Sequence, residues 1–134
     1  MSVRAPTRTV WLATLLVILH ALLWLSAAAM LIVDGVQARV NGQSFALLEL
    51  DPLLLGLVMI VLTAFLGWLH YAAVRHRSRS RSFLIGVLFF ILGVLTCILI
   101  PWGAAWDVAH YAVVGADLFI GISMVRWGIQ LARR

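Results

Sequence analysis

The sequence predicts an all-α integral membrane protein, folded as an antiparallel bundle of four transmembrane helices. Its composition is 64% hydrophobic and 11% charged, with a mean hydropathy of +1.08. A soluble domain is roughly half apolar and a quarter charged, so lipid must be the solvent for most of this surface. The apolar residues gather in four segments, each long enough to cross a hydrocarbon core of about 30 Å. Such a core admits helices because they satisfy their backbone hydrogen bonds internally.

The arginines predict how these helices are oriented. All ten basic residues are arginines, and nine precede the first segment, join the second to the third, or follow the fourth. Only Arg39 lies on the other side, together with four acidic residues: Asp34, Glu49, Asp51 and Asp107. Short basic connections remain cytoplasmic, so both termini are predicted to be cytoplasmic. We therefore expect one transmembrane domain, residues 1–134, in the plasma (inner) membrane.

The first span is predicted over residues 10–33 and the second over residues 53–74. The first is uncharged and would be roughly 36 Å long as a helix. A cleaved signal peptide is the alternative for it, but the apolar run exceeds the usual length of about 7–15 residues. The second span has a clear beginning, because Asp51 can cap the helix and Pro52 suits its first turn.

The third span is predicted over residues 83–100 and the fourth over residues 108–125. Pro101 follows the third span as a stop signal, and Asp107 can cap the fourth. Five tryptophans lie near the predicted span ends, as in the aromatic belts of membrane proteins. They are Trp11, Trp68, Trp102, Trp106 and Trp127. Trp24 lies well inside the first span and is expected to pack there.

The external connection, residues 34–52, contains Asn41-Gly42 between alternating polar and apolar residues. This pattern favours a short β-hairpin. The alternative is an irregular loop with a single tight turn.

The cytoplasmic connection, residues 75–82, alternates arginine with serine or histidine. Its arginines could bind anionic lipid head groups, at about 1 kcal/mol per basic residue near the surface. They are Arg75, Arg77, Arg79 and Arg81. The alternative is that they only enforce the topology. Nucleic acid is not an expected partner, because the charge lies in short loops beside apolar spans.

Asp117 and His20 are the polar residues predicted to lie deepest in the membrane. Each is ten residues from a span end, which places both roughly 15 Å deep, Asp117 from the outer side and His20 from the inner side. An intramembrane carboxylate indicates a functional site by default. We predict that the two side chains meet, either as a proton or ion relay or as a hydrogen-bonded pair that fixes helix register.

The fourth span carries a polar and small stripe that includes His110 and Asp117. Its members recur every three or four residues and so share one helix face, which should contact protein rather than lipid. They are Asp107, His110, Val114, Asp117, Gly121 and Met124. Small residues also recur on single faces at positions 21 and 28, 86 and 93, and 112 and 116. Such faces allow close packing of helices in lipid.

No catalytic constellation, metal site or cofactor is predicted. Haem b would need two histidines at similar depth, whereas His70 lies roughly 6 Å deep and His20 roughly 15 Å. A copper(I) site from Met30, Cys97 and His110 would have soft ligands, but the three are scattered. Cys97 is expected to be a buried or lipid-facing side chain.

These features favour a non-catalytic accessory subunit that binds a partner in a larger membrane complex, not an enzyme. One alternative is a homo-oligomeric transporter or channel coupled to protons or ions through Asp117 and His20. A second alternative is a membrane redox subunit that binds haem or quinone. In each case the partners are the bilayer and another membrane protein or a second copy of the chain.

Overall fold

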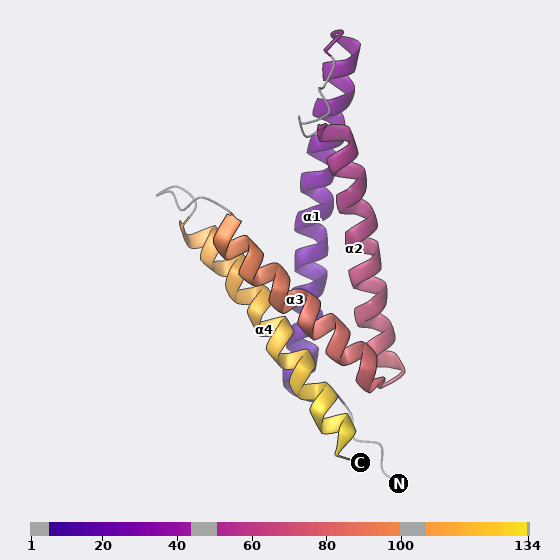
Figure 1. Ribbon diagram of the computed structural model, residues 1–134, viewed down its shortest axis with the longest axis vertical. Coiled ribbons are helices and arrows are strands. Elements are labelled where there is room, and N and C mark those ends of the chain that lie inside the picture. Colours follow the sequence, from indigo (N-terminus) through magenta and orange to yellow (C-terminus); the bar gives the residue numbers. More distant parts are fainter. Residues whose placement is uncertain (1–5, 44–50, 100–106, 134) are drawn as a thin grey trace. The chain divides into compact units, whose positions relative to one another are not determined.

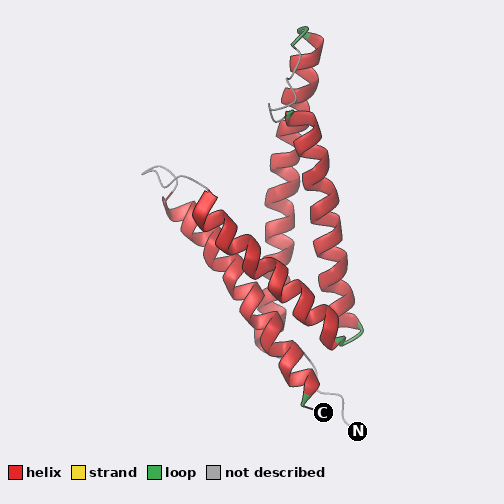
Figure 2. Cartoon of the chain, viewed as in Figure 1, coloured by secondary structure: helices red, strands yellow, loops and turns green. Residues whose placement is uncertain are grey.

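The computed structural model describes residues 6–43, 51–99 and 107–133, and four helices account for almost all of them. The helices are α1 (Arg8–Val40), α2 (Pro52–Arg75), α3 (Arg79–Leu99) and α4 (Asp107–Ala132) (Figure 1). The described residues include no strand (Figure 2). All four helices are long and apolar enough to cross a membrane. The prediction of an all-helical, multi-pass membrane protein is thus confirmed.

The chain forms two compact units, each of which is described by itself. Unit 1 comprises Met1–Ile18 and Trp68–Arg134, and therefore holds the first part of α1, the end of α2, and α3 with α4. Unit 2 is Leu19–Gly67, the rest of α1 and α2. Most of the buried apolar side chains belong to unit 1. The largest of them are Ile85, Phe89, Ile120, Met124 and Trp127.

Helix α1 is longer than the predicted span and ends in a glycine cap. Its 33 residues correspond to about 50 Å, well beyond a hydrocarbon core of about 30 Å. The Gln43 N–H donates to the Ala38 carbonyl and the Gly42 N–H to the Arg39 carbonyl, both at 3.0 Å. With Gly42 at φ 76°, this is a Schellman motif.

The prediction of a first hairpin strand in the external connection is therefore wrong. Residues 36–40 are helical, and the Asn41-Gly42 pair caps α1 instead of forming a hairpin turn. Both structures need a residue at positive φ, which glycine supplies without steric cost. The second predicted strand covers residues 43–45, of which residues 44 and 45 lie outside the described residues.

Asp51 caps the start of α2, as predicted. Its Oδ1 accepts a hydrogen bond from the Leu53 N–H at 3.0 Å, and its Oδ2 pairs with the Arg39 guanidinium at the end of α1. Capping satisfies a backbone donor that the helix itself cannot. The ion pair also neutralises the one arginine that the sequence places on the outer side.

The connection between α2 and α3 is much tighter than the predicted loop of residues 75–82. The Ser78 N–H donates to Ala73 O at 3.2 Å, and Arg77 has a φ of 48° at the cap position that glycine usually takes. Ser78 then caps the start of α3, because its Oγ accepts a hydrogen bond from the Arg81 N–H at 3.5 Å. Arg75, Arg79 and Arg81 are therefore helical, and Arg77 occupies the turn.

Replacing Arg77 with glycine should stabilise the protein by about 1 kcal/mol, because a left-handed backbone conformation is costly for any residue with a Cβ. Arg75→Gly is the matched control. It removes the same charge from the last turn of α2 and should cost about 1 kcal/mol through lost helix propensity. The free energy of unfolding of both variants in detergent, followed by circular dichroism, distinguishes the two effects. Equal destabilisation of both would contradict the cap.

Helices α3 and α4 lie side by side and approach closely at glycines (Figure 1). A Cβ built on Gly86 would lie 2.7 Å from Val125 Cγ2 and 2.9 Å from the Gly121 carbonyl oxygen. Further along α3, Gly93 faces Asp117 instead, so the two helices run in opposite directions. Close backbone approach of this kind is how helices pack in lipid.

Unit 2 is packed in the same way. A Cβ on Gly35 would lie 2.5 Å from the Leu53 nitrogen, and one on Gly56 would lie 2.8 Å from the Ala28 carbonyl oxygen. Glycine at these two positions lets the backbones of α1 and α2 touch. The small residue Ala28, singled out in the sequence, is fully buried.

Candidate functional site

Asp117 is completely buried in the packing between α3 and α4. A Cβ on Gly93 would lie 3.1 Å from the Asp117 Cβ and 3.2 Å from the Leu118 side chain. Because Gly93 has no side chain, there is room between α3 and α4 for the Cβ of Asp117. The small face predicted at positions 86 and 93 is confirmed, because both glycines contact α4.

The predicted stripe on α4 faces protein. Five of its six members are buried: His110, Val114, Asp117, Gly121 and Met124. His110 is 6% exposed and lies two turns, roughly 10 Å, from Asp117 along the helix. Its ring is edge-on to that of Tyr111, with the centroids 6.4 Å apart. Two polar groups thus share the buried face of α4.

His20 is also buried, and it belongs to unit 2. It is 8% exposed, and its ring lies 4.9 Å from that of Trp24, tilted by 35°. The prediction that Trp24 packs within the span is confirmed. A contact between His20 and Asp117 would join unit 2 to unit 1, and it stays a prediction.

A polar contact that the sequence did not suggest connects α1 to α2 within unit 1. Thr14 Oγ1 lies 2.9 Å from His70 Nε2 and 2.9 Å from the Val10 carbonyl oxygen. The hydroxyl has one hydrogen, and a carbonyl can only accept, so that hydrogen goes to Val10. His70 Nε2 must then carry the hydrogen that Thr14 accepts. The contact gives one nitrogen of the buried His70 ring a hydrogen-bond partner on α1.

Replacing Thr14 with valine should destabilise the protein by about 1 kcal/mol. Valine keeps the shape, but it leaves the buried Nε2–H of His70 without its acceptor. Thr96→Val is the control, because the Thr96 hydroxyl contacts only the Leu92 carbonyl of its own helix. The comparison is made by denaturant unfolding in detergent, and an equal effect of the two substitutions would contradict a role for the Thr14–His70 bond.

The arginines near the α2–α3 turn lie over aromatic rings. Arg75 is 5.8 Å from the centre of the Tyr71 ring, and Arg81 is 5.9 Å from that of Trp68. Arg79 lies 5.9 Å from the Phe83 ring. Each arrangement permits a cation–π interaction. Trp68 and Tyr71 are more than half exposed, which suits side chains at the level of lipid head groups.

The aromatic belt stays a prediction, and the exposure of its tryptophans fits it only in part. Trp11 and Trp68 are 60% and 58% exposed, as an interfacial role requires. Trp127 is 2% exposed and belongs to the core of unit 1, so its assignment to the belt is wrong. A buried indole serves packing, whereas a belt residue must reach the interface. Trp102 and Trp106 lie outside the described residues.

Within residues 6–43, 51–99 and 107–133, no three histidine, cysteine, aspartate or glutamate side chains form a group that could hold a metal ion. Cys97 is half-buried in α3.

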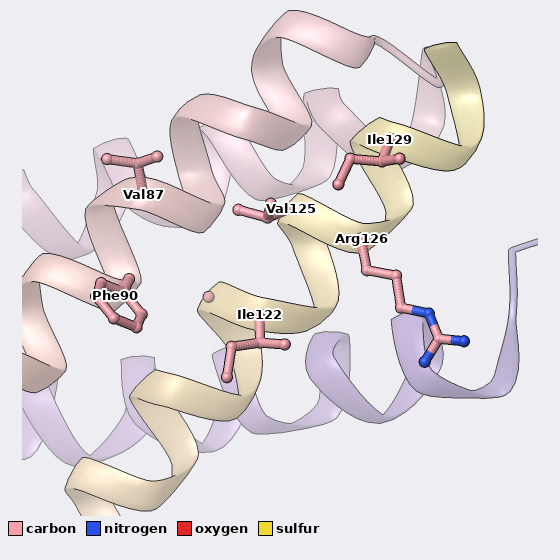
Figure 3. Close-up of a pocket in the computed structure, with 7 residues that line it drawn as sticks. Val87, Phe90, Ile122, Val125, Arg126 and Ile129 are labelled. Atoms are coloured by element: carbon pink, nitrogen blue, oxygen red, sulfur yellow. The ribbon is translucent and has the colours of Figure 1, made fainter. Parts of the chain in front are cut away.

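A groove of about 420 Å³ opens between α3 and α4. Its lining is almost entirely apolar, and Arg126 is the one charged residue in it (Figure 3). The lining residues are Val87, Phe90, Gly121, Ile122, Val125, Arg126 and Ile129. In Figure 3 the guanidinium of Arg126 extends beyond the apolar side chains.

Four apolar helices, with a buried acid where two of them pack, define the chain as a multi-pass helical membrane protein. No family model, curated protein or solved structure matches it.

Proposed function

We propose that this protein is a non-catalytic accessory subunit that binds another membrane protein through one face of α4. The observation that carries this proposal is the environment of Gly115. A Cβ built there would meet nothing within 4 Å, whereas one built on Gly121 would lie 2.9 Å from backbone atoms of α3. Glycine at position 121 is needed for the close packing of α4 against α3, whereas the described residues give no packing reason for glycine at position 115.

Gly115 belongs to an exposed face of α4 in which residues recur at intervals of four, three and seven positions. Ala112 and Gly115 are both exposed, and Val108 and Ile122 on the same face are 85% and 59% exposed. A surface of small residues flanked by larger apolar ones lets a second helix approach closely in lipid. We call residues 108, 112, 115 and 122 the open face of α4.

The test is co-purification in a mild detergent with Gly115 replaced by leucine. The wild type should bring down one membrane protein in stoichiometric amount, and Gly115→Leu should lose it because the added side chain blocks close approach. Ala64→Leu on the exposed surface of α2 is the matched control and should retain the same partner. Recovery of the wild type only as a free monomer would contradict the proposal.

The proposal includes an arrangement of the whole chain. We propose an antiparallel bundle of four transmembrane helices in a plasma (inner) membrane, with both termini cytoplasmic. The distribution of arginines supports this orientation. So does the opposite end, where the sequence has a single arginine, Arg39, and that arginine pairs with Asp51.

Cysteine accessibility tests this topology. In a Cys97→Ala background, Gln43→Cys should react with a membrane-impermeant maleimide added outside intact cells, and His76→Cys should react only after the cells are opened. Gln43 follows the cap of α1, and His76 lies in the α2–α3 turn. The reverse pattern would overturn the proposed orientation.

A second candidate function is proton- or ion-coupled transport by a homo-oligomer. The burial of Asp117 and His20, at 0% and 8% exposure, favours it, because buried ionisable groups in membrane helices often serve ion pathways. Reconstituted protein should then carry a pH-dependent flux that Asp117→Asn abolishes. Absence of flux from the wild type would remove this candidate.

A further inference from the structure

We propose that the groove between α3 and α4 binds one anionic phospholipid of the inner leaflet, with an acyl chain along the groove and the phosphate at Arg126. This site differs from the arginines of the α2–α3 turn. It adjoins the open face of α4, with which it shares Ile122, and it rests on the proposed orientation of the chain in the membrane.

The groove has the lining that an acyl chain requires. Val87 and Phe90 of α3 form one wall, and Ile122, Val125 and Ile129 of α4 form the other (Figure 3). Gly121 lies between these walls, where the backbone of α4 packs closely against α3. Its volume of about 420 Å³ falls within the range of about 300–1,000 Å³ typical of small-molecule sites. A whole helix, about 10 Å across, would need a wider surface.

The position of Arg126 suits a lipid phosphate. It follows Asp117 by nine residues, which places it roughly 13 Å further along the helix toward the inner side. With Asp117 near the midplane, Arg126 reaches the inner boundary of a core about 30 Å thick. The apolar part of the groove then lies at the depth of the acyl chains.

Neither α3 nor the part of α4 after Asp117 contains an acidic residue that could pair with Arg126. The sequence has five acidic residues, all at position 117 or before it, and α3 contains none. Arg126 is exposed, and an anion that pairs with its guanidinium would come from outside α3 and this part of α4. A phosphate at the mouth of an apolar groove meets this requirement, because guanidinium groups bind phosphate with two parallel hydrogen bonds.

The test is native mass spectrometry of the delipidated full-length protein, titrated with phosphatidylglycerol or phosphatidylcholine of identical acyl chains. Wild type should retain one phosphatidylglycerol in preference to phosphatidylcholine. Arg126→Gln should weaken the binding of phosphatidylglycerol about fivefold, because one basic residue near a lipid surface contributes about 1 kcal/mol. The binding of phosphatidylcholine should not change. Arg133→Gln is the control, since it removes an arginine of the inner side that lies outside the groove.

A second pair of variants tests the apolar part. Val87→Trp should fill the groove and weaken both lipids, whereas Leu84→Trp, at a similarly exposed position of α3 outside the groove, should not. Ile122→Trp fills the groove from α4 if Val87→Trp does not fold. The proposal is overturned if Arg126→Gln and Arg133→Gln have the same effect, if the groove-filling variants bind like Leu84→Trp, or if the wild type binds both lipids equally.

Discussion

Replacing Gly86 with alanine should destabilise the protein by about 1–3 kcal/mol, the usual cost of forcing a methyl group into a filled space. The new Cβ would lie 2.9 Å from the Gly121 carbonyl oxygen and 2.9 Å from the Val125 nitrogen. Both are backbone atoms, which cannot rotate away as a side chain can. Helix α4 would have to move away from α3 at this contact.

The matched control is Gly115→Ala, the same substitution in α4. Nothing lies within 4 Å of a Cβ at Gly115, so alanine should stabilise the helix by about 1 kcal/mol through its higher propensity. Both free energies of unfolding are measured in the same detergent by circular dichroism. A destabilisation by Gly115→Ala equal to that by Gly86→Ala would contradict the glycine contact between α3 and α4.

Replacing Asp117 with arginine should prevent α3 and α4 from packing. The Asp117 side chain is fully buried beside Gly93, which leaves no room for a longer side chain. An arginine near the centre of a membrane helix also costs at least about 2.5–3.5 kcal/mol on insertion scales. We expect little folded protein from Asp117→Arg in a detergent gel-filtration profile.

Asp117→Asn is the control, because asparagine keeps the size of the side chain and carries no formal charge. It should fold like the wild type, which also makes it suitable for the flux measurement of the transport candidate. Equal yields of monodisperse Asp117→Arg and Asp117→Asn protein would show that Asp117 does not occupy the tight space assigned to it.

Hydropathy located the four helices but not their ends. The hydropathy pattern predicts that the first span ends at residue 33, whereas α1 continues to Val40. Hydropathy indicates whether a segment lies in lipid or in water, and it does not indicate where the helical backbone ends. The ends of α1 and α2 are set by local hydrogen bonds at Gly42 and Arg77. An Asn-Gly pair supplies the positive φ for a hairpin or for a helix cap, so the dipeptide alone could not decide between them.

The α4 stripe was predictable because its members follow one helix face, a property that the sequence carries directly. The contact of Thr14 with His70 was not, since it joins single polar residues 56 positions apart with no periodicity between them. Arg75 and Tyr71 are four residues apart on one helix, so their stacking could have been inferred from spacing alone. Arg81 over Trp68 depends on the tight turn at Arg77, which the sequence did not suggest.

Crosslinking in native membranes tests the proposed function most directly. A photoreactive amino acid is placed at Ala112 on the open face of α4 and, as a control, at Ala64 on the exposed surface of α2. If α4 binds a partner, Ala112 should give one discrete adduct with another membrane protein, and Ala64 should give none. Adducts with lipid alone at Ala112, or the same protein adduct from both positions, would contradict a partner-binding role for α4.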